Sequence, residues 1–200
     1  RATKHTDEAL EQFVNDCDAS SIKSVWIHNI YLANLATDKP EMLEKSIASV
    51  VNALTIADKI SATGVVLHTG SHKGLGIDAV SDQVIMALTK ILDQTPSNTR
   101  LALENMAGQG GVIGASFEEL GMLIAGVDSD RLGVCFDTCH AFAAGYDISN
   151  SESVDKTMKE FDVAIGFDKL LVVHANDSLM ELGGNRDRHE NIGQGFIGDF

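Results

Sequence analysis

Five residues that can bind a metal ion or transfer a proton follow short aliphatic runs along the chain. They are His28, His68, Glu104, Asp137 and His174. The intervals between them are 40, 36, 33 and 37 residues, close to the length of one strand-helix unit. A lone histidine after a strand is usually structural, but five such residues at this spacing indicate a shared site. Imidazole and carboxylate groups together are typical ligands of zinc and similar ions.

Three further residues extend this set toward the C-terminus. His140 lies three residues after Asp137, and His189 lies two residues after Asp187. Side chains three apart on a helical turn, or two apart in an extended segment, can face one site. The candidates outnumber the ligands of a single tetrahedral zinc, so the sequence predicts two or three ions. Clustered divalent ions are a common device for cleaving phosphodiester bonds.

Aliphatic runs alternate with amphipathic segments, which predicts alternating strands and helices. The expected strands cover residues 24–27, 64–67, 100–103, 132–136 and 170–173. The expected helices cover residues 6–17, 40–60, 79–92, 117–125 and 154–166. Continuously apolar strands separated by helices indicate a parallel sheet covered on both faces.

This order puts the five candidate ligands at the carboxyl ends of successive parallel strands. Such ends converge in a closed barrel, whereas an open sheet spreads them along an edge. We therefore predict an α/β fold, a TIM-type (β/α)8 barrel, as one domain over residues 1–200. Eight units usually need about 250 residues, so we expect a fragment that lacks the first unit and about two final units.

The composition is that of an ordinary globular domain, with 44% hydrophobic residues. The sequence contains neither a bilayer-spanning apolar run nor a secretory signal, and we expect a cytoplasmic protein with no membrane association. Cys17, Cys135 and Cys139 form no CxxC pair, so we expect reduced cysteines in the core. The formal net charge of -14 opposes DNA binding, but three divalent ions would add 6 and leave -8.

Several longer motifs resemble signatures of the endonuclease IV family, within the xylose isomerase-like TIM barrel superfamily. They cover residues 68–72, 104–108, 137–147, 174–177 and 187–195. The resemblance runs in order from His28 to Phe200. It implies a zinc-dependent DNA repair hydrolase that cleaves double-stranded DNA 5′ to abasic sites, leaving a 3′-hydroxyl and a 5′-deoxyribose phosphate. We expect this enzyme to act as a monomer.

The resemblance also implies three zinc ions. The first would bind His28, His68 and Glu104, the second Glu104, Asp137 and His174, and the third His140, Asp187 and His189. Glu104, which bridges the first two ions, is the expected catalytic residue. The sequence departs from the family in two ways: Thr69 stands where proline is usual, and the chain ends before a C-terminal glutamate that completes the second set.

Four residues are candidates for DNA contacts. Tyr31 and Leu32 resemble a pair that the family inserts into the minor groove at the lesion, where apolar wedges hold a kinked duplex. The alternative is a loop aromatic that packs locally. Arg186 and Arg188 flank Asp187 and can either bind phosphate or neutralise nearby carboxylates; we favour phosphate.

Two other functions remain open. A sugar isomerase or epimerase of the same barrel type also gathers Glu, Asp and His around one or two metals, and fold alone does not separate it from a nuclease. The set His140, Asp187 and His189 favours the nuclease. A module that binds abasic DNA without cutting it is the second alternative. The segment 193–198 spells GxGxxG, but no expected strand precedes it, so we predict no nucleotide cofactor.

Overall fold

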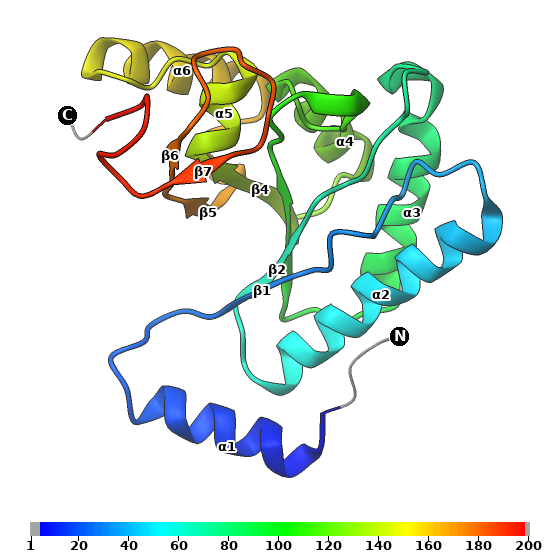
Figure 1. Ribbon diagram of the computed structural model, residues 1–200. Helices are drawn as coiled ribbons and strands as arrows, with labels where there is room; N and C mark the ends of the chain where they lie inside the picture. The colour runs from blue at the N-terminus through cyan, green and yellow to red at the C-terminus, as the bar shows by residue number, and fades with distance from the viewer. Residues whose placement is uncertain (1–4, 199–200) are drawn as a thin grey trace.

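The computed structural model describes residues 5–198 and contains a parallel sheet with helices on its outer face (Figure 1). The strands of this sheet are β1 (Trp26–His28), β2 (Gly64–Leu67), β3 (Arg100–Glu104), β4 (Leu132–Asp137) and β5 (Leu170–His174). The α-helices are α1 (Asp7–Asp18), α2 (Pro40–Lys59), α3 (Ser81–Asp93), α4 (Phe117–Val127), α5 (Thr138–Ala144) and α6 (Ser151–Ala164). A small antiparallel ladder joins β6 (Asp177–Ser178) to β7 (His189–Glu190).

Local sequence signals mark the starts of several helices. Pro40 occupies the first turn of α2, where its missing N–H group leaves no partner unsatisfied. Ser116 accepts the Glu119 N–H at the start of α4. Asp137 does the same for α5 by accepting the His140 N–H at 2.8 Å, so one of the candidate ligands also holds the helix that carries another.

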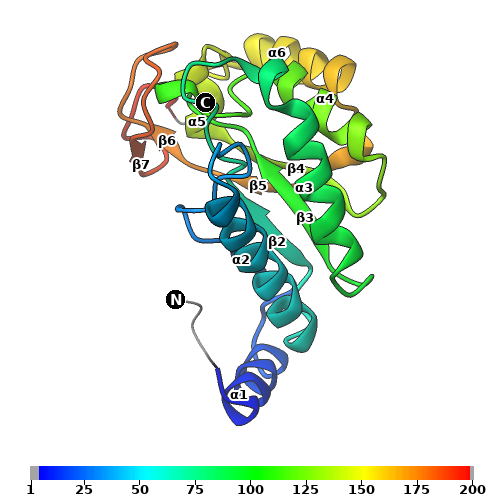
Figure 2. The same cartoon turned by 90° about the vertical axis from the view of Figure 1, so that its right-hand side faces the viewer.

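The sheet order is β1-β2-β3-β4-β5, and every neighbouring pair is parallel. Sequential parallel order with a helix between strands is the arrangement of a (β/α) barrel. Figures 1 and 2 show α2, α3, α4 and α6 following one another around the outer face of the curved sheet. The predicted fold class, a TIM-type barrel present in part, is confirmed.

The strands bury two different faces. Alternate residues such as Val65, Leu103 and Val134 belong to the main core between the sheet and the helices. The residues between them form a second, smaller cluster on the inner face, built around Val66, Ala102 and Cys135. This alternation follows from the two-residue period of a strand, and it decides which way the strand ends point.

The observed elements differ from the expected ones in a few places. The first strand begins at Trp26 and reaches His28, two residues later at its start than expected. Helix α5 and the β6–β7 ladder were not expected as elements, because both are too short to show a period. Cys135 and Cys139 are buried as expected, but the prediction was wrong for Cys17, which is partly exposed on α1. That helix buries no residue and lies at one end of the molecule beside the last turn of α2, where Lys59 contacts Asp7 at 3.0 Å (Figure 2).

Within residues 5–198, no helix combines the length and apolar character needed to cross a membrane.

Candidate metal centre

The inner face of the sheet carries the five strand-end residues to one place. Each lies two positions after a residue of the inner apolar cluster: His28 after Trp26, His68 after Val66, Glu104 after Ala102, Asp137 after Cys135 and His174 after Val172. Because side chains alternate along a strand, all five point inward at the carboxyl edge. A register shift at β4 places Asp137 directly opposite His174.

Glu104 lies at the centre of this cluster. Its Oε2 is 2.9 Å from Nε2 of His28 and 2.9 Å from Nε2 of His68. Its Oε1 is 3.0 Å from Nδ1 of His174 and 3.4 Å from Nδ1 of His140. One carboxylate thus joins four imidazoles that come from four different parts of the chain.

Burial and ionic contacts act in opposite directions on Glu104. Burial raises its pKa, but hydrogen bonds from the four histidines lower it more, so the pKa falls far below its ordinary value. The group is a carboxylate throughout the neutral range. The same contact with Glu104 raises the pKa of His28. The cluster therefore combines a buried anion with imidazoles that form hydrogen bonds to it.

Two histidines are oriented by backbone carbonyl groups. His28 Nδ1 donates to Asn29 O at 2.9 Å, and His140 Nδ1 donates to Asn105 O at 2.9 Å. A carbonyl only accepts, so Nδ1 carries a hydrogen, and Nε2 is the ring nitrogen left for a carboxylate or a metal ion. In His28, Nε2 lies 2.9 Å from Glu104 Oε2, with a proton between the two atoms in the metal-free protein. A metal ion can take the place of such a proton, and carbonyl-held histidines are typical of metal sites.

The segment after β6 completes a second group. His140 Nε2 lies 3.2 Å from Asp187 Oδ2 and 3.4 Å from His189 Nε2. His189 Nε2 lies 3.3 Å from Asp187 Oδ1. Burial lowers the pKa of His140, but hydrogen bonds with Asp187 and Glu104 raise it to about 10. The donor atoms of His140, Asp187 and His189 all lie within 4.8 Å of one another.

The eight predicted ligands therefore lie in one continuous cluster. The residue groups with the spacing of a metal site are His28, Glu104 and His174; Glu104, Asp137 and His140; Asp137, Cys139 and His189; and His140, Asp187 and His189. His68 joins through Glu104 Oε2. Glu104, Asp137 and His140 are buried, whereas His28 and His189 are each 44% exposed at the side chain, so the cluster opens to solvent on one side.

Sequence reasoning gave no role to two asparagines that orient Asp137. Asn105 Oδ1 accepts the Asp137 N–H at 2.7 Å, and Asn105 Nδ2 donates to Asp137 O at 3.0 Å. Asn176 Nδ2 donates to Asp137 Oδ2 at 2.7 Å. Both asparagines stand within two residues of a strand-end ligand. That position was the signal available in the sequence.

The four residues predicted to contact DNA are exposed. Tyr31 is 65% and Leu32 is 82% exposed in the loop after β1. The Tyr31 and His68 rings also form a T-shaped pair, with ring centroids 5.5 Å apart, so this loop borders the cluster of candidate ligands. Arg186 and Arg188 are exposed on either side of Asp187. Their phosphate contacts stay a prediction.

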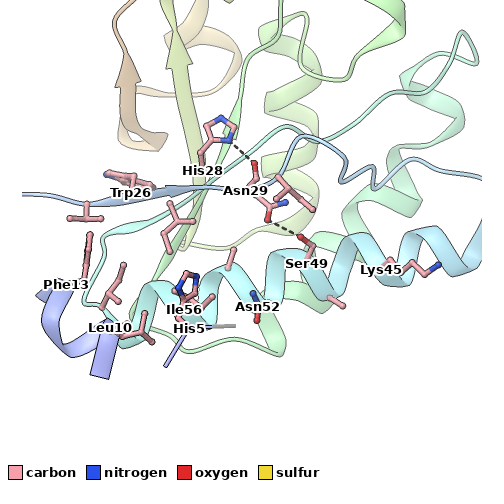
Figure 3. Close-up of a pocket in the computed structure, with 17 residues that line it drawn as sticks. His5, Leu10, Phe13, Trp26, His28, Asn29, Lys45, Ser49, Asn52 and Ile56 are labelled. Atoms are coloured by element: carbon pink, nitrogen blue, oxygen red, sulfur yellow. Dashed lines mark hydrogen bonds between the residues drawn. The ribbon is translucent and has the colours of Figure 1, made fainter. Parts of the chain in front are cut away.

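A cavity of about 890 Å³ lies beside the cluster rather than at it. It opens between α1, the outer edge of β1 and α2 (Figure 3). Its walls are mainly apolar, from residues such as Leu10, Phe13 and Ile56. Figure 3 shows His28 held by Asn29, whose Oδ1 in turn accepts from Ser49 at 3.3 Å. The cavity thus contacts His28 but none of the other seven candidate ligands.

Fold and site together define a (β/α) barrel protein with clustered metal-type ligands at the carboxyl ends of its strands. The profile of the xylose isomerase-like TIM barrel family matches residues 1–200. The probable endonuclease 4 of Staphylococcus saprophyticus is 43% identical over 182 residues, which is 90% of this chain and 60% of that protein. Endonuclease IV from Thermus thermophilus is 37% identical, with a TM-score of 0.87 over 100% of this chain and 70% of that one. The chain belongs to the endonuclease IV family of xylose isomerase-like TIM barrels.

A likeness of fold extends further. A D-tagatose 3-epimerase-like protein superposes with a TM-score of 0.78 at 22% identity, over 95% of this chain and 68% of that one. Identity at this level shows a shared barrel only. The chain spans about 60% of the length of the Staphylococcus relative.

Proposed function

We propose that this protein is a zinc-dependent endonuclease that cleaves double-stranded DNA 5′ to abasic sites, leaving a 3′-hydroxyl and a 5′-deoxyribose phosphate. One observation carries the proposal: His140, Asp187 and His189 lie together beside the strand-end cluster. This extra group suits a reaction in which both an attacking and a leaving oxygen need stabilisation. The family relationship supports the same reaction.

We assign eight residues to three zinc ions. The first set is His28, His68 and Glu104, the second Glu104, Asp137 and His174, and the third His140, Asp187 and His189. When bound, clustered divalent ions activate water as a nucleophile and stabilise charge on the phosphate and on the leaving oxygen. The donor chemistry fits zinc because imidazole and carboxylate groups supply every contact.

The chain's own residues prepare this site in three ways. Glu104 stays ionised in a buried position and so holds four imidazoles at one point. Asn105 holds the backbone of Asp137 and Asn176 holds its carboxylate, so the carboxylate keeps one orientation. The hydrogen bonds of His28 and His140 to carbonyl groups orient each ring so that Nε2 faces the carboxylates of the cluster. Such outer contacts typically contribute 10- to 100-fold in metal affinity, on the order found at other metal sites.

The proposed DNA contacts surround the exposed side of the cluster. Tyr31 and Leu32 are the residues that we assign to the space left at the abasic nucleotide, because both side chains are exposed beside His68. Arg186 and Arg188 are assigned to phosphate. The acidic net charge of -14 is counted without bound cations, so the local field at the site rather than the total charge guides the duplex.

A sugar isomerase or epimerase is the second candidate, on the fold likeness to the epimerase-like protein. That chemistry shifts a proton or hydride at one or two metals and leaves His140, Asp187 and His189 without a use. A module that binds abasic DNA without cutting is the third. Metal content and product analysis separate all three.

The test compares a duplex containing one abasic site with the same duplex undamaged. The expected result is a single zinc-dependent nick on the 5′ side, with a 3′ end that a polymerase can extend, and no nick in the undamaged control. Metal analysis should give about three zinc per chain, as a multinuclear site requires. Retained binding without a nick would favour the binding module, and turnover of a keto-sugar with one or two manganese ions would favour the isomerase.

A further inference from the structure

Asp177 is a buried carboxylate to which the proposed function gives no role. It is 1% exposed and lies on β6, three residues after His174. Its two oxygens accept five backbone N–H groups. The donors are Ser178 at 2.7 Å, Gly195 at 2.9 Å, Ile197 at 2.9 Å, Gly193 at 3.0 Å and Gly198 at 3.3 Å.

Four of these donors belong to the GxGxxG run. Gly193 and Gly198 adopt φ angles of 79° and 90°, which turn nearby N–H groups toward one point, as in an anion-binding nest. A Cβ at Gly195 would lie 2.5 Å from Asp177 Oδ1 and 2.3 Å from Ser178 O, so this position admits no side chain. The run therefore binds an anion, and that anion is the chain's own carboxylate.

The position of Asp177 links this loop to a metal ligand. On the ladder, Ser178 lies opposite His189, and the Leu179 N–H donates to Arg188 O at 2.9 Å. The loop that Asp177 gathers begins directly after β7, the strand that carries His189. The carboxylate thus holds the chain both beside and beyond this ligand.

The strength of the contact follows from the charge of Asp177. Burial raises its pKa, but the backbone N–H donors, led by Gly195 and Ser178, lower it below the ordinary value. Hydrogen bonds from N–H groups to an ionised carboxylate are stronger than those between neutral groups. Asparagine at this position would keep the size and lose one acceptor, because its NH2 group would face N–H donors.

We propose that Asp177 is a positioning residue for the group His140, Asp187 and His189, and acts through the loop that it gathers. The proposal deepens the proposed function, since this group is one of its metal sets. Asp177→Asn should weaken zinc binding at this group by about 10- to 100-fold, the usual effect of an outer-shell change. Zinc at the group of His28 and Glu104 should be unaffected.

The experiment measures zinc binding and hydrogen exchange without DNA. Zinc is titrated against a competing chelator, and histidine ring NMR signals show which group fills. Amide exchange at Gly193, Gly195 and Gly198 is followed in the metal-free protein. The matched control is Glu190→Gln, the same carboxylate-to-amide change directly opposite Asp177 on the ladder. Asp177→Asn should exchange faster at the loop and lose zinc selectively, and the control should do neither.

A second variant changes the loop instead of the carboxylate. Gly195→Ala keeps the carboxylate but pushes the loop away from it, and should reproduce the selective zinc loss. Unchanged zinc affinity in Asp177→Asn, or equal loss at every group in both variants, would overturn the proposal. If the parent protein fails to nick abasic DNA while selective zinc loss is seen, the proposed function fails and the role of Asp177 stands.

Discussion

The substitution Glu104→Gln should weaken zinc binding more than any other single change. Glutamine has nearly the same shape, but one carboxylate oxygen becomes an NH2 group that neither accepts a proton nor binds a metal. Oε2 contacts His28 and His68, and Oε1 contacts His174 and His140. Whichever way the amide is oriented, two imidazoles lose their acceptor atom and all four lose the negative charge.

The magnitude follows from the loss of one ligand oxygen and of the carboxylate charge. Changes in groups that only orient a ligand typically weaken metal binding by about 10- to 100-fold, so the loss of a direct ligand should weaken zinc binding by about 100-fold or more. Each 1.4 kcal/mol corresponds to about ten-fold in an equilibrium constant, so this loss is about 3 kcal/mol or more. Solvent screens little of this effect, because the Glu104 side chain is only 2% exposed.

Chelator competition measures the zinc affinity, and single-turnover nicking of an abasic duplex measures the activity, which should fall with it. The matched control is Glu119→Gln on α4. Glu119 Oε2 accepts the Gly114 N–H at 2.7 Å, and an amide oxygen can replace it there. A zinc affinity within ten-fold of the parent protein, or an equal loss in the control, would refute the central role of Glu104.

Three further predictions test other parts of the site. Tyr31→Ala should weaken binding to an abasic duplex about five-fold or more, by analogy with aromatic–base stacking energies of about 1–3 kcal/mol, while the single-turnover rate at saturation changes little; an unchanged Kd with a slower rate would instead place Tyr31 at the reaction. In metal-free protein, His140 has a folded pKa of about 10 against 6.5 for the free group, so its stabilisation is complete below pH 6.5 and is lost as the pH rises through 10. The free energy of unfolding in urea with a chelator should therefore fall by a few kcal/mol between pH 7 and 10, and equal falls in the parent and in His140→Gln would contradict this. Burial raises the pKa of Cys139 to about 11, so iodoacetamide at pH 8 should leave Cys139 intact and modify partly exposed Cys17; mass spectrometry of the native protein decides, and rapid labelling of Cys139 would show that the site is open.

Much of the fold could be predicted from the sequence because its pattern is local. The apolar run before His68 gave a strand at residues 64–67, as observed in β2. The amphipathic period from Pro40 gave a helix within one residue of α2. Regular spacing then predicted that the strand ends share one edge, and the parallel register confirms it. The two-residue period of a strand further determines that these side chains point to the inner face.

Tertiary structure alone decided how those side chains meet. Glu104 contacts His28 across 76 residues and His174 across 70 residues of sequence, and such contacts depend on sheet curvature that no local pattern encodes. The role of the GxGxxG run was decided in the same way. Its spacing is that of a phosphate loop, yet its N–H groups converge on Asp177, because the β6–β7 ladder brings a buried carboxylate to the point where a ligand would otherwise bind. The sequence determines which groups can form bonds, but only the folded backbone determines the directions in which they point.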